Sequence, residues 1–214
     1  MIEWKIKYNL SRLFKRMRTN HLKKFTSNDT LFIHIPKAAG MTITTQLYGE
    51  EVGHYPAKDW KACDKKMFSK IYKFTIARNP VSRVCSAYNF LSKGGMEHHK
   101  YDLRFKREVI DNFSNINEFV INYLNEKTKY SYIHFYPQTF FLLDDKGDLL
   151  VDEIYKVEEL DEAIMSLNKR GLNLSNKLIN TTGLPSVVDT LSPEAYKKII
   201  DIYKDDYKLL GYDF

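Results

Sequence analysis

One stretch limits the possible folds more than any other: an apolar run that ends in proline and leads through small residues into a helical pattern. Residues 31–35 are rich in strand-forming side chains, and Pro36 ends the run because it lacks a backbone N–H and fixes its own φ. Lys37 is followed by small residues, so successive backbone N–H groups can face one anion before residues 41–48 continue as a helix. Unpaired amides at a helix start favour phosphate or sulfate. The stretch therefore predicts a strand, an anion-binding turn and a helix.

The order of lysine and glycine separates this turn from that of nucleoside triphosphatases, in which the lysine directly precedes the magnesium-binding hydroxyl. Here Lys37 precedes Gly40, and no glycine stands five residues before Gly40. This order resembles the 5′-phosphosulfate loop of sulfotransferases, which use 3′-phosphoadenosine 5′-phosphosulfate (PAPS) and need no metal. The run His-Ile-Pro-Lys-Ala-Ala-Gly is similar to that of carbohydrate O-sulfotransferases of the heparan sulfate 2-O/6-O type and their bacterial relatives. Ala38 and Met41 stand where those enzymes usually carry hydroxyl residues, whereas Thr42 keeps one.

A second motif follows about 40 residues later. Residues 70–77 predict a buried strand, Arg78 follows its carboxyl end, and Asn79 with Pro80 can cap the next helix. The run from Arg78 to Tyr88 resembles the Arg-x-Pro-x-x-Arg-x-x-Ser-x-Tyr pattern with which these sulfotransferases hold the 3′-phosphate of PAPS. The resemblance implies that Arg78 and Ser86 are the ligands and that Arg83 supports the local fold.

The resemblance also implies roles for the first loop. The expected donor-binding residues are Lys37, Ala38, Ala39, Gly40, Met41 and Thr42, with Lys37 also stabilising charge in the transition state. His54 lies between the two motifs, where these enzymes often place a histidine, and is the expected general base because a neutral imidazole can accept a hydroxyl proton near neutral pH. His134 is the alternative base. In the alternative interpretation of His54, it is a surface histidine without a catalytic role.

The whole chain predicts a single α/β domain with a short, mostly parallel central sheet flanked by helices, a P-loop-like sulfotransferase fold over residues 29–214. Residues 140–143 and 149–155 are expected to be two strands of a hairpin, residues 158–170 a helix, and the last helix to begin at Ser192. The 214 residues suffice for one such domain. The two cysteines have no metal-binding spacing, no metal site is expected, and no apolar run predicts a membrane span or signal peptide. A reducing cytoplasm fits this composition.

The formal net charge of +6 comes from the N-terminus. Residues 1–28 hold eight Lys or Arg residues and one Glu, with an apolar stripe at helical spacing. This basic amphipathic arm can lie at the inner face of a membrane or on a polyanion, or dock on its own domain. Nucleic acid is not an expected partner, because no recognition motif accompanies the charge.

The resemblance implies transfer of a sulfuryl group from PAPS to a hydroxyl of a saccharide, such as a cell-surface polysaccharide or glycolipid, with release of adenosine 3′,5′-bisphosphate. Two alternatives stay open at this point. One is an ATP- or GTP-dependent kinase with a degenerate loop, although no convincing magnesium carboxylate follows a strand. The other is a non-catalytic protein that binds polyanions or membranes through residues 1–28.

Overall fold

The computed structural model describes residue 25 and residues 29–96, 99–175 and 187–213. The basic arm predicted over residues 1–28 lies outside these ranges except for Phe25. The described chain divides into two compact units. The first, called the sheet unit, contains residues 25, 29–78 and 138–175, and the second, called the helical unit, contains residues 79–96, 99–137 and 187–213.

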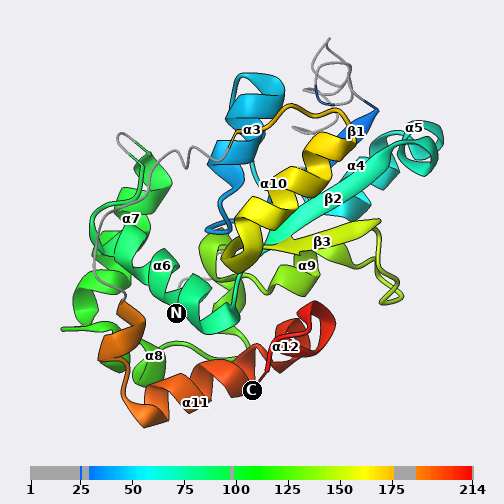
Figure 1. Ribbon diagram of the computed structural model, residues 1–214. Helices are drawn as coiled ribbons and strands as arrows, with labels where there is room; N and C mark the ends of the chain where they lie inside the picture. Colours follow the sequence, from blue (N-terminus) through cyan, green and yellow to red (C-terminus); the bar gives the residue numbers. More distant parts are fainter. Residues whose placement is uncertain (1–24, 26–28, 97–98, 176–186, 214) are drawn as a thin grey trace. The chain divides into compact units, whose positions relative to one another are not determined.

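The sheet unit is built on a three-stranded sheet with the order β1-β2-β3, as Figure 1 shows. Its strands are β1 (Thr30–Ile33), β2 (Tyr72–Ala77) and β3 (Glu153–Lys156). Both pairings are parallel, with Ile33 opposite Thr75 and Ala77 opposite Lys156. The α/β class and the parallel central sheet are therefore confirmed. All three strands end at the same edge, where ligands gather in open parallel sheets.

Strands β1 and β2 form because their apolar residues are buried, as is typical of parallel sheets covered on both faces. Leu31, Phe32 and Ile33 are almost fully buried, and so are Phe74 and Ile76. The backbone N–H of Phe32 donates to the hydroxyl of Tyr48 at 3.0 Å. That bond ties β1 to the helix that follows it in sequence.

Helices cover the sheet within this unit, and α10 packs along β3 (Figure 1). The helices of the sheet unit are α3 (Gly40–Tyr48), α4 (Ala57–Cys63), α5 (Lys65–Lys70), α9 (Gln138–Leu142) and α10 (Leu160–Lys169), with the 3-10 turn η4 (Val157–Glu159). The strand expected over residues 140–143 is wrong, because residues 138–142 are helical and Leu143 N–H donates to the Thr139 carbonyl. Only one antiparallel bridge, Leu143 to Leu149, remains of the expected hairpin.

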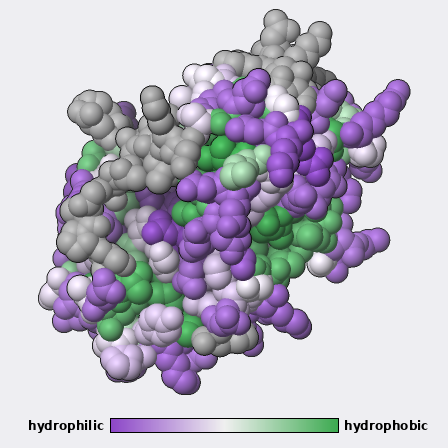
Figure 2. Space-filling model, viewed as in Figure 1, coloured by the Kyte–Doolittle hydropathy of each residue, from purple (hydrophilic) through white to green (hydrophobic). Residues whose placement is uncertain are grey.

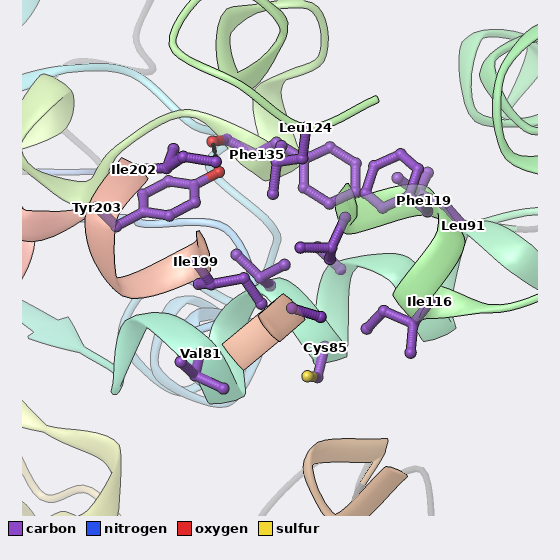
Figure 3. Close-up of a cluster of buried hydrophobic side chains, with 14 of the residues drawn as sticks. Val81, Cys85, Leu91, Ile116, Phe119, Leu124, Phe135, Ile199, Ile202 and Tyr203 are labelled. Atoms are coloured by element: carbon purple, nitrogen blue, oxygen red, sulfur yellow. Dashed lines mark hydrogen bonds between the residues drawn. The ribbon is translucent and has the colours of Figure 1, made fainter. Parts of the chain in front are cut away.

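The helical unit has a hydrophobic core of its own. Its helices are α6 (Pro80–Ser92), α7 (Lys100–Glu108), α8 (Ile116–Asn122), α11 (Pro193–Ile202) and α12 (Lys204–Leu210), with 3-10 turns η1 (Ile110–Asn112), η2 (Thr128–Tyr130), η3 (Ile133–Phe135) and η5 (Val187–Thr190). Figure 3 shows buried apolar side chains of α6, α8 and α11 gathered in one cluster. The last helix begins after Ser192 as expected, but it breaks at Tyr203, whose buried hydroxyl donates to the Phe135 carbonyl at 2.6 Å.

Polar and charged side chains occupy most of the face shown in Figure 2, with apolar patches between them. Among the described residues, no helix combines the length and the apolar character that crossing a membrane requires.

Candidate anion-binding and catalytic site

The loop after β1 has a strained backbone. Lys37 and Ala39 adopt positive φ angles of 66° and 55°, which L-residues other than Asn and Asp rarely adopt. Residues held in this left-handed region cost about 1–3 kcal/mol each and gather at functional sites. Alternating right- and left-handed residues turn successive N–H groups toward one point and form concave anion sites. The geometry therefore supports the predicted role of this loop.

Helix α3 begins directly at this loop. Its N-cap residue, Ala39, provides no side-chain hydrogen bond to the first turn, and the first turn contains no acidic residue. Neither a capping side chain at Ala39 nor a carboxylate in the first turn therefore offsets the positive end of the α3 dipole. An anionic ligand can meet the N-terminal amides of α3.

Gly40 is required at the start of α3 by a histidine. A Cβ atom at this position would overlap the Cδ2 and Nε2 atoms of His34. His34 directly follows β1 and is 3% exposed, so its ring cannot readily move away. The ring of His34 therefore packs over the beginning of the helix, a contact that no sequence pattern indicated.

Arg78 reaches the same loop from the end of β2. Its Nη1 atom donates to the Lys37 carbonyl at 3.4 Å. Its backbone is held by Gln138, which is fully buried: Arg78 N–H donates to Gln138 Oε1 at 3.0 Å, and Gln138 Nε2 donates to the Arg78 carbonyl at 2.7 Å. Gln138 thus fixes the point from which the guanidinium extends. This role of Gln138 was not predicted from the sequence.

His54 also lies beside the loop that follows β1. Its Nδ1 atom is 3.3 Å from the His34 carbonyl, and the two imidazole centroids are 4.2 Å apart. A carbonyl can only accept, so Nδ1 carries the proton in this hydrogen bond. The lone pair of neutral His54 then lies on Nε2, the tautomer that a general base needs.

The electrostatics around His34 keep it neutral. Burial lowers its pKa well below the ordinary value for histidine, and the neighbouring His54 and Lys37 lower it further, against an opposing contribution from the backbone of Gly53. His34 therefore adds no positive charge to the loop, and Lys37 and Arg78 supply the cationic side chains identified there.

The comparison with known protein families agrees with this geometry. A family model described as "Sulfotransferase family" matches residues 17–213, which is nearly the whole chain. The chain belongs to the sulfotransferase family. No match was found among curated proteins or among solved structures.

The remaining candidate residues of this sulfotransferase lie in the helical unit. Ser86 is half-buried on α6, and the Asn79 side chain caps that helix by accepting from Ser82 N–H at 3.2 Å. The predicted supporting role of Arg83 is confirmed: it is fully buried and donates to the carbonyls of His134 at 3.0 Å and Tyr136 at 2.6 Å.

His134, the alternative base, is also described within the helical unit. Its ring packs edge-on against Phe90 with centroids 5.1 Å apart, and its Nε2 atom is 3.9 Å from Asp102 Oδ1. It is 8% exposed. This ring is more enclosed than the half-buried ring of His54.

Proposed function

We propose that this sulfotransferase transfers the sulfuryl group of PAPS to a hydroxyl of a saccharide and releases adenosine 3′,5′-bisphosphate. One observation carries the proposal: the carboxyl ends of β1 and β2 bring together the uncapped start of α3, Lys37 and Arg78. These groups match the charge of a phosphosulfate. No step of this reaction calls for a metal ion.

The proposed donor site divides into two parts. The backbone amides of residues 38–42, together with Lys37, bind the 5′-phosphosulfate. Arg78 and Ser86 bind the 3′-phosphate, an assignment supported by the sequence motif. A guanidinium and a hydroxyl suit a phosphate dianion, because charge-assisted hydrogen bonds are the strong ones.

In the proposed reaction the acceptor oxygen forms a bond to sulfur while the bond between sulfur and the bridging phosphate oxygen breaks. The hydroxyl proton passes to Nε2 of His54, and the bridging oxygen leaves with the nucleotide. Lys37 stabilises the charge that develops on this oxygen. Catalysis then consists of positioning and electrostatic stabilisation, as in phosphoryl transfer.

The nucleotide preference tests the proposal. Adenosine 3′,5′-bisphosphate should bind at least about tenfold more tightly than AMP, because a charge-assisted hydrogen bond contributes about 1.5–3 kcal/mol. Calorimetry of wild type and Arg78→Ala with both nucleotides measures this. Arg78→Ala should remove most of the preference and leave AMP binding less affected. Equal affinity of the wild type for the two nucleotides would contradict the assignment.

The acceptor is tested in a separate experiment, in which the enzyme and labelled PAPS are incubated with surface polysaccharides from the producing cell. Incorporation of label supports a saccharide acceptor, and turnover on non-saccharide hydroxyls alone contradicts it. Action in the cytoplasm, with residues 1–28 holding the enzyme at the inner face of the membrane, is part of the same proposal. Removal of these residues should leave turnover on a small acceptor unchanged.

A further inference from the structure

Three side chains at or near the loop that follows β1 lie close enough to share one metal ion. His34, Glu51 and His54 each offer a ligand atom, and these atoms all lie within 4.8 Å of one another. His34 is buried, whereas Glu51 and His54 are half-buried. Among the residues that the structure describes, this is the group of histidine, cysteine and carboxylate side chains with such spacing.

The two imidazoles are in the state that a metal requires. Nδ1 of His34 is buried and has no hydrogen-bond partner in the described part of the chain. A buried polar atom without a partner is unfavourable and calls for an explanation such as an ion. Because Nδ1 of His54 faces the His34 carbonyl, the lone pair of His54 lies on Nε2.

Contacts with the backbone hold both histidines in place. The His34 ring packs over Gly40, and the hydrogen bond from His54 Nδ1 to the His34 carbonyl orients the second imidazole. Orientation of a ligand histidine by a carbonyl on its other nitrogen is the usual outer-shell arrangement of metal sites. Glu51, whose side chain is half-buried, can change rotamer to complete the set.

We propose that His34, Glu51 and His54 form a Zn²⁺ site and that zinc binding there inhibits the sulfotransferase. The inhibition rests on the proposed role of His54, because a metal on Nε2 takes the lone pair that would accept the hydroxyl proton. Zinc at this site acts as an inhibitor and not as a cofactor of the proposed transfer.

The ligand set selects the ion. Two imidazoles and one carboxylate suit Zn²⁺, whereas Mg²⁺ and Ca²⁺ prefer oxygen ligands. Ligand atoms in a tetrahedral zinc site with bonds of about 2.0–2.1 Å lie roughly 3.3 Å apart. The present separations therefore need a contraction of at most about 1.5 Å. Water would fill the fourth position.

Direct binding tests the site without any turnover. The full chain, dialysed against EDTA and then against buffer, is titrated with Zn²⁺ by calorimetry, and Co²⁺ absorption spectra report the ligand geometry. One tight site is expected. His54→Ala and Glu51→Gln should each weaken it by more than the roughly 10–100-fold that loss of an outer-shell partner causes. Mg²⁺ should not compete.

A matched control comes from the helical unit. His99 is a half-exposed histidine whose Nδ1 lies 2.9 Å from Asp102, so His99→Ala removes another imidazole beside a carboxylate. This variant should bind zinc like the wild type. Loss of binding in His99→Ala, or full retention in both His54→Ala and Glu51→Gln, would overturn the site. Thermal unfolding without metal checks that each variant is folded.

Turnover tests the inhibition. Zinc should abolish sulfuryl transfer by the wild type in proportion to site occupancy, excess EDTA should restore it, and Glu51→Gln should require correspondingly more zinc. Zinc that binds at this site but leaves turnover unchanged, or raises it, overturns the inhibitory role. If metal-free enzyme shows no transfer at all, the proposed function fails, while the binding titration still decides the metal site.

Discussion

Two helices of this protein follow parallel strands of the same sheet, yet their N-termini differ. Helix α6 is closed by its own residues, since Asn79 caps it and Pro80 occupies its first turn. Helix α3 begins at Gly40, and its N-cap residue Ala39 has a positive φ and no capping side chain. Capping is usually worth about 0.5–2 kcal/mol, so the open end of α3 gives up stability.

The difference shows where a ligand is expected to complete the structure. At the start of α6, the side chain of Asn79 accepts a hydrogen bond from a backbone N–H. The start of α3 instead has a strained backbone, with Lys37 and the guanidinium of Arg78 nearby. Strain that persists at such a point is commonly part of a binding site. The predictions below either replace side chains with a proposed catalytic role near the start of α3 or remove the side-chain cap of α6.

The largest effect is expected at His54. His54→Ala should lower kcat by about 10²–10⁴, because the acceptor hydroxyl loses its general base. The affinity for adenosine 3′,5′-bisphosphate should stay close to that of the wild type, since His54 makes no proposed contact with the nucleotide. Steady-state kinetics and calorimetry on the same preparation measure both.

The control for this variant is His134→Ala, which removes the other candidate base. Its ring is buried beside Phe90, so we expect a loss of stability with turnover largely kept. Retained turnover in His54→Ala together with lost turnover in a folded His134→Ala would reverse the assignment of the base.

Lys37 should show the next largest effect. Its ammonium meets charge that develops on the leaving oxygen, so it contributes more to the transition state than to ground-state binding. Lys37→Ala should lower kcat by about two orders of magnitude, the scale seen when an oxyanion donor is removed. A raised KM with unchanged kcat would show instead that Lys37 only binds the donor. Lys58→Ala, on α4, is a matched control without expected effect on kcat.

Much of this contrast was predictable from local sequence. Proline after an apolar run, small residues before a helical pattern, and Asn-Pro at the start of α6 each act through backbone geometry within a few residues. For that reason the first strand, the loop, α3 and the cap at Asn79 were all found.

Other features depend on tertiary contacts that no local sequence pattern indicates. The contact between His34 and Gly40 arises from the way the chain turns back after β1. The hydrogen bond between Gln138 and Arg78 joins residues that are 60 positions apart. Residues 140–143 were assigned to a strand because a short apolar run has no period that separates a strand from a buried helix. Only packing around α9 decides between them.

The smallest effect is expected at Asn79, which caps the N-terminus of α6. Asn79→Ala should lower the free energy of unfolding by about 0.5–2 kcal/mol, because the Ser82 N–H at the start of α6 loses its acceptor. Asn115→Ala is the matched control: Asn115 caps α8 by accepting from Glu118 N–H at 3.1 Å. Both caps should lower stability in urea denaturation, and neither should weaken nucleotide binding as much as Arg78→Ala. If Asn79→Ala instead lost nucleotide affinity at unchanged stability, the start of α6 would be a ligand site like that of α3.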